Sequence, residues 1–107
     1  MEKVKVIFEI EVIYYLDALI KNLYLEDYFS YIENAETYVE RIYEFVEHNI
    51  HTFPHKKTPV KLSHLGSSYI FYKSNSRTTW YLFFELRNSN YLITGILNNH
   101  CAAARFI

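Results

Sequence analysis

Two different spacings of apolar residues divide this chain, and they limit its fold more than any other feature. In residues 12–50 the apolar residues recur three or four positions apart, which is the spacing of helices that bury one stripe. In residues 3–11, and again in residues 69–98, apolar residues form short alternating runs separated by polar turns, which is typical of strands. The sequence therefore predicts an α+β domain.

The first half predicts one strand and then two helices. The strand covers residues 3–11, where Val4, Val6, Phe8 and Ile10 share one face. The first helix covers residues 12–25, and its apolar stripe is Val12, Leu16, Leu19, Ile20 and Leu23. A capping box formed by Ser30 and Glu33 starts a second helix near Tyr31, and Pro54 ends it. The stripe of this second helix is Ala35, Tyr38, Val39, Ile42, Val46 and Ile50.

The second half predicts a small antiparallel sheet. Residues 52–68 contain both prolines and form a loop, and the strands follow at residues 69–73, 79–86 and 91–98. Polar turns of about three residues join these strands, and such short connections favour antiparallel pairing. We expect the N-terminal strand to add to this meander as an edge and both helices to cover one face. Residues 99–107 form an irregular tail or one helical turn. Residues 1–107 are thus a single β-α-α-β-β-β domain with a four-stranded, mainly antiparallel, twisted sheet.

The charges are distributed unequally along the chain. Residues 1–52 carry four lysines and arginines against eleven acids, whereas residues 53–107 carry seven against Glu85 alone. Such a division suggests that the C-terminal half meets a polyanion or an acidic partner. No apolar run is long enough to cross a membrane, and the lone Cys101 is compatible with a reducing cytoplasm, where we expect the protein.

No cofactor or metal is predicted from the sequence. The only glycines are Gly66 and Gly95, so a glycine-rich phosphate loop is excluded. The histidines do not follow a recognised zinc-ligand spacing.

The C-terminal segments resemble one known family. Residues 76–85, SRTTWYLFFE, look like the central strand of RelE/ParE toxins from bacterial type II toxin–antitoxin modules. Residues 91–100, YLITGILNNH, look like the last strand of that family, with its terminal Asn-Asn-His. The resemblance implies a toxin with a cognate antitoxin protein as its partner. It also implies either a ribosome-dependent mRNA endoribonuclease or an inhibitor of DNA gyrase.

For the endoribonuclease, the resemblance implies a site of basic side chains and one terminal proton-transfer residue. His100 matches that terminal histidine, and Arg77 is the nearest arginine to the central strand, so these two are the candidate catalytic residues. Candidates for binding nucleic acid or antitoxin are Lys56, Lys57, Lys61, Lys73, Tyr81, Asn99 and Arg105. Regular pairing of Leu86 with Tyr91 would place Arg77 beside His100. We expect both to converge with the lysines of residues 56–61 on one face of the sheet.

The target remains open at this point. Tyr81 occupies the place where nuclease members commonly carry an arginine, which favours a gyrase inhibitor without catalysis of its own or an inactive binding module. The retained His100 favours the mRNA endoribonuclease. Homodimer formation is also compatible with the sequence.

Overall fold

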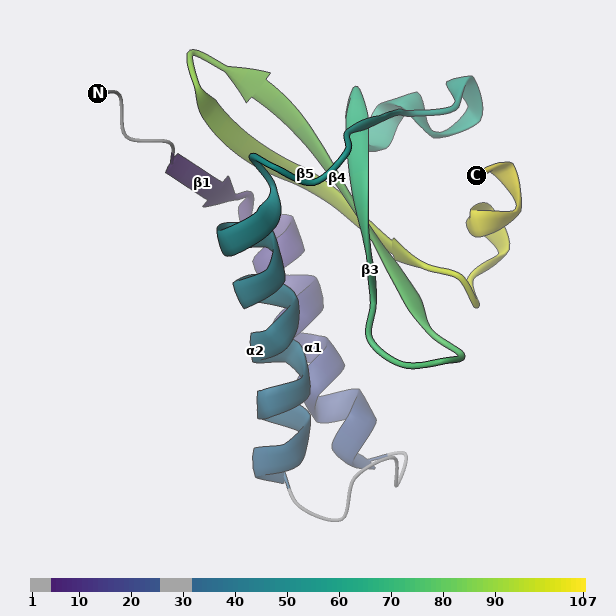
Figure 1. Ribbon diagram of the computed structural model, residues 1–107. Coiled ribbons are helices and arrows are strands. Elements are labelled where there is room, and N and C mark those ends of the chain that lie inside the picture. The colour runs from purple at the N-terminus through teal and green to yellow at the C-terminus, as the bar shows by residue number, and fades with distance from the viewer. Residues whose placement is uncertain (1–4, 26–31) are drawn as a thin grey trace.

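The architecture is a mixed five-stranded sheet with two long helices on one face (Figure 1). The computed structural model describes residues 5–25 and 32–107. Its elements in chain order are β1 (Lys5–Phe8), α1 (Ile10–Leu25), α2 (Ile32–Asn49), β2 (Lys56–Lys57), the 3-10 helix η1 (Val60–Leu65), β3 (Ser68–Lys73), β4 (Thr79–Arg87), β5 (Asn90–Asn98) and the 3-10 helix η2 (Ala102–Phe106). The spatial order of the strands is β1-β5-β4-β3-β2. No helix among these residues is long and apolar enough to span a membrane.

The α+β class, both long helices and the antiparallel β3–β4–β5 meander are confirmed. The expected edge position of the first strand is also confirmed, and β1 pairs in parallel with β5. The prediction of four strands was wrong by one. β2 was missed because its two lysines are exposed, so only backbone pairing with Ser68 and Tyr69 marks it as a strand.

The junction between β1 and α1 differs from the prediction. Alternation of apolar residues continues to Glu11, but the strand ends at Phe8 and the helix begins at Ile10. The reason is a backbone hydrogen bond: the carbonyl of Glu9 accepts from the amides of Val12 and Ile13, at 3.0 and 3.1 Å. The proposed capping residue Ser30 lies outside the described residues.

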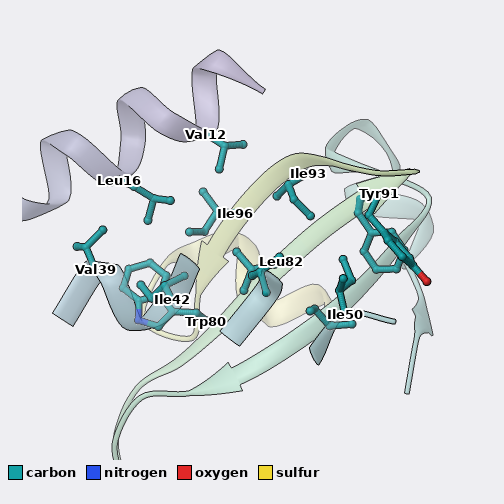
Figure 2. Close-up of a cluster of buried hydrophobic side chains, with 13 residues drawn as sticks. Val12, Leu16, Val39, Ile42, Ile50, Trp80, Leu82, Tyr91, Ile93 and Ile96 are labelled. Carbon is teal, nitrogen blue, oxygen red and sulfur yellow. The ribbon is translucent and has the colours of Figure 1, made fainter. Parts of the chain in front are cut away.

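The main core lies between the helices and the sheet (Figure 2). Leu16 of α1 and Ile42 of α2 are fully buried against Leu82 and Ile96 of the sheet. Apart from Ala35, which is buried but lies outside this cluster, the stripe residues of both helices pack into this core, as their spacing predicted. The buried members of the cluster are Val12, Leu16, Val39, Ile42, Val46, Ile50, Ile70, Trp80, Leu82, Phe84, Tyr91, Ile93 and Ile96.

A second, smaller core covers the opposite face of the sheet. It consists of Leu62 from η1 with Tyr69 and Phe83 from the sheet, flanked by partly buried residues of η1 and η2. η1 approaches the sheet closely because glycine lies at the contact. A Cβ on Gly95 would stand 2.8 Å from the carbonyl oxygen of Leu65, and Gly66 has a φ of 154°, which side-chain-bearing residues rarely adopt. β4 is therefore buried on both faces.

Truncating the main core should destabilise the protein far more than truncating the outer side of the same helix. Leu16 is fully buried, so Leu16→Ala should lower the free energy of unfolding by about 2–5 kcal/mol. Leu25→Ala is the matched control, since Leu25 is 68% exposed in the single chain, and in samples dilute enough to be monomeric its effect should stay within about 0.5 kcal/mol. Urea denaturation followed by circular dichroism measures both. Equal losses would contradict the observed orientation of α1.

Candidate functional site

The β3–β4 turn and the residues after β5 meet at one end of the sheet. Antiparallel pairing of β4 with β5 brings the start of β4 at Thr79 beside the end of β5 at Asn98. The side chain of Asn99 connects the two segments through hydrogen bonds. Its amide oxygen accepts from the backbone N–H of Thr79 and its Nδ2 donates to the carbonyl of Arg77, both at 2.9 Å. Both polar groups of the Asn99 side-chain amide are therefore hydrogen-bonded to the backbone of this site.

Two further asparagines shape the same end of the sheet. The Oδ1 of Asn75 accepts from the backbone amides of Arg77 and Thr78, at 2.8 and 2.9 Å. The Oδ1 of Asn98 accepts in the same way from the amides of His100 and Cys101, at 2.8 and 3.1 Å. Side-chain oxygens used in this way define tight turns and fix the orientation of each amide group.

His100 lies beside Thr78, one residue away from the expected neighbour. Its Nε2 is 3.1 Å from the Thr78 hydroxyl oxygen. The prediction that Arg77 faces His100 across the strand pair was wrong because β5 contains a bulge. Phe84 pairs with Ile93 but Phe83 pairs with Gly95, so one extra residue shifts all later pairs by one position.

His100 and Arg77 nevertheless line the same hollow. This open hollow has a volume of about 670 Å³ and lies between the helices and the start of β4. Leu19, Leu23 and Trp80 supply apolar surface, while polar groups come from the two turns and from Asn22 of α1 and Tyr38 of α2. The described residues of the lining are Leu19, Asn22, Leu23, Tyr38, Asn75, Arg77, Thr78, Trp80, Asn98 and His100.

Among the described residues of the lining there is no carboxylate, and Arg77 and the asparagine Nδ2 groups supply hydrogen-bond donors. Arg77 is exposed and carries the fixed positive charge of the hollow. The side-chain oxygens of Asn75 and Asn98 already accept from backbone amides, so the groups that these side chains can still offer to a ligand are their Nδ2 donors. An anionic ligand that is rich in acceptors suits such a lining.

The aromatic wall of the hollow is held by hydrogen bonds. Trp80 is 2% exposed, and its indole Nε1 donates to the Tyr38 hydroxyl at 2.9 Å. The same hydroxyl is 2.8 Å from the hydroxyl of Ser74 in the β3–β4 turn. This chain links α2, β4 and the turn, so the wall has a defined position relative to Arg77 and His100.

A second hollow lies on the opposite face of the sheet. It has a volume of about 390 Å³ and is lined by Lys56, Tyr69, Phe71, Lys73, Thr79, Tyr81 and Ile107. The Nζ of Lys56 is 6.0 Å from the centre of the Phe71 ring. Burial, together with the nearby Tyr81, raises the pKa of Tyr69. Two ammonium groups among aromatic rings again suit an anionic, partly planar ligand.

The remaining binding candidates lie outside both hollows. Lys57 is exposed on β2 and Lys61 is exposed on η1. Arg105 is exposed on η2, where its guanidinium is 4.8 Å from the centre of the Phe106 ring. The expected convergence of His100, Arg77 and the lysines on one face was therefore wrong. The physical reason is that successive residues of β4 face opposite sides, so Trp80 lines one hollow while Thr79 and Tyr81 line the other.

Sequence reasoning missed Asn75, Thr78 and Asn98, although the motifs around them were visible. Asparagine and serine in the segment 74–78 indicated a turn, and the pair at positions 98 and 99 indicated the end of a strand. Their joint placement depends on the register between β4 and β5. Within residues 5–25 and 32–107 no group of three or more His, Cys, Asp or Glu side chains is arranged to hold a metal ion.

No protein-family model matches the sequence, and no curated protein or solved structure matches it either. The function of the site must therefore be argued from its own geometry.

Removing the Asn99 side-chain amide should lower the stability of the protein and change the conformation of this site. Asn99→Ala leaves the Thr79 amide and the Arg77 carbonyl without their partners, so we expect a loss of about 1–2 kcal/mol in unfolding free energy. The NMR resonances of Arg77, Thr78 and His100 should shift, whereas those of the α1–α2 core should not. Asn34→Ala, at an exposed position of α2, is the matched control and should change neither property. Unchanged resonances at the site would show that Asn99 does not position it.

Proposed function

We propose that this chain is the toxin of a type II toxin–antitoxin module, of the RelE/ParE kind, and that it cleaves mRNA on the ribosome. One observation carries the proposal: His100 and Arg77 line one open hollow, and no described residue of its lining is a carboxylate. A histidine that can accept a proton and a cation that can meet a phosphate are two groups that phosphodiester cleavage requires. The β-α-α-β-β-β order of the main elements and the C-terminal Asn-Asn-His support the same assignment.

In the proposed reaction His100 takes the proton from a ribose 2′-hydroxyl. The 2′-oxygen then attacks the adjacent phosphorus, and the bond from phosphorus to the 5′-oxygen breaks, leaving a 2′,3′-cyclic phosphate. The leaving 5′-oxygen takes a proton from water, and His100 returns its proton to solvent. Arg77 stabilises the additional negative charge on the phosphate oxygens in the transition state. Thr78 holds the imidazole through Nε2 and so restricts its rotation.

Dependence on the ribosome is proposed because His100 and Arg77 are the two candidate catalytic groups among the described residues of the hollow. One base and one cation do not by themselves align a flexible RNA strand for in-line attack. Aligning a flexible strand costs conformational entropy, and an RNA that is already held in a fixed conformation avoids this cost. Well-oriented reactants gain several orders of magnitude in rate. The proposed substrate is therefore mRNA presented in the ribosomal decoding site.

The proposed antitoxin would cover the basic half of the molecule. Lys56 and Lys73 line the second hollow, where an acidic or extended segment would find both charges and aromatic surface. This arrangement agrees with the excess of lysine and arginine in residues 53–107.

A second candidate is a gyrase inhibitor that acts only by binding. The specific observation in its favour is the position of Tyr81, which takes the place of the arginine that nuclease members carry. Tyr81 lines the second hollow, on the face opposite His100, and so adds no group to the proposed site. The apolar surface of Leu19, Leu23 and Trp80 would then receive a protein side chain. A toxin-fold module without activity is the remaining alternative.

Substitution of the two candidate catalytic residues tests the endoribonuclease. His100→Gln and Arg77→Ala should each lower mRNA cleavage by about 10²-fold or more and relieve growth arrest after induction. Primer extension on cellular RNA measures cleavage. His51→Gln and Arg87→Ala are matched controls, since both residues are exposed and line neither hollow, and both variants should remain toxic.

The readouts separate the alternatives. Arrest with intact mRNA and with accumulated DNA breaks would identify gyrase as the target and reject the ribonuclease. Undiminished cleavage in both His100→Gln and Arg77→Ala would show that the site lies elsewhere. A wild-type chain that causes no arrest would favour the inactive module.

A further inference from the structure

The outer faces of the two long helices differ in composition. α2 presents a charged outer face, as expected of a helix that contacts water. Its exposed acids are Glu33, Glu36, Glu40, Glu44 and Glu47. α1 has only Glu11, Asp17 and Lys21 as charged residues in sixteen positions.

The side of α1 that faces away from the core is largely apolar. Ile10 is 59% exposed, Tyr14 is 63% exposed and Leu25 is 68% exposed. With Ala18 and Lys21 they recur three or four positions apart, which places all five on one stripe. We call these five residues the outer stripe of α1. A helix that is apolar on its outer side as well as its inner side is normally covered on both.

We propose that a second copy of the chain covers the outer stripe, with α1 of the two copies packed antiparallel about a twofold axis near Ala18. The proposal does not depend on the toxin assignment. It commits to a second copy because the stripe is complementary to itself in both shape and charge.

The shape complementarity follows from the order of residues along the stripe. An axis near Ala18 brings the two small Ala18 side chains together, so the helices approach closely at the centre. Ile10 then meets Leu25 of the partner subunit at each end. Tyr14 meets Lys21 of the partner subunit, and an ammonium group packs favourably on a tyrosine ring. Every contact away from the axis occurs twice, as an isologous interface requires.

The charge complementarity comes from Asp17 and Lys21. Asp17 is exposed on the edge of the stripe nearest α2. The pKa of Tyr43, a residue of α2, is raised mainly by burial and further by the nearby carboxylate of Asp17. In the antiparallel arrangement Asp17 comes within side-chain reach of Lys21 of the partner subunit. The two pairs neutralise the only charges near the centre of the interface. The outer face of α2, by contrast, carries five exposed glutamates against Arg41 alone, so pairing two copies through α2 would bring mainly like charges together.

The length of the contact predicts a weak dimer. Sixteen helical residues span about 24 Å, and a single helix pair of that length buries less surface than a standard stable interface. We therefore expect dissociation in the micromolar range.

Sedimentation velocity across the micromolar range tests the dimer directly. The wild-type chain should shift from monomer to dimer with rising concentration. Tyr14→Ser should raise the dissociation constant about tenfold or more, because Tyr14 lies at the interface and not in the core. Asp17→Lys should raise it as well, since it places like charges together. The double variant Asp17→Lys/Lys21→Asp should bind more tightly than Asp17→Lys alone because it restores opposite charges between the copies, although it removes the ammonium group from the Tyr14 ring.

Glu40→Lys is the matched control, because it reverses a charge on the outer face of α2 and should leave the dissociation constant unchanged. Circular dichroism of dilute samples verifies that each variant is folded. A chain that stays monomeric at every concentration overturns the proposal and assigns the stripe to another protein or to a membrane surface. A dimer that is indifferent to Tyr14→Ser, or a double variant that binds no more tightly than Asp17→Lys, overturns the antiparallel α1 interface.

Discussion

The pairing of β5 with β4 is the constraint on which most of this structure depends. β5 carries one extra residue between the partners of Phe84 and Phe83, and Thr94 occupies that bulge. The bulge allows Ile93 and Ile96, three residues apart, to enter the same helix-covered core. It also directs the Thr94 hydroxyl at the opposite face, where it donates to the carbonyl of Leu65 at 2.5 Å. One local irregularity thus fits β5 to helices on one side and to η1 on the other.

The candidate site is a consequence of this register. After the bulge, each residue of β5 lies opposite the β4 residue one position later in the chain than an unbulged strand would give. His100 therefore meets Thr78 and not Arg77. Asn75, Asn98 and Asn99 then use their side chains to fix the backbone of the two segments that deliver Arg77 and His100. Backbone groups at the end of a sheet would otherwise lack strand partners, and these amides satisfy them. The polar side of the hollow is therefore built by residues that first serve the fold.

The same sheet separates its cationic residues. Arg77 lines the hollow under the helices, while Lys56 and Lys73 line the hollow on the other face. An anionic ligand on one face is therefore not in contact with the cations of the other. If RNA and an acidic protein segment both bind this chain, two separate surfaces are available to them, and the proposed dimer stripe on α1 is a third.

The sequence by itself determined the two long helices, the three C-terminal strands and the main core. Two apolar periods gave both helix stripes and the three C-terminal strands, because side-chain spacing on a helix or strand is a local property. It also placed His100 and Arg77 at the same end of the sheet, since short polar turns enforce antiparallel pairing. Only the tertiary structure decided the register and the faces. The segment Leu92–Leu97 has apolar residues that suit either a regular or a bulged strand, and packing of Leu65 against Gly95 and Thr94 selects the bulged one. That contact joins residues about thirty positions apart, and no local pattern in the sequence encodes it.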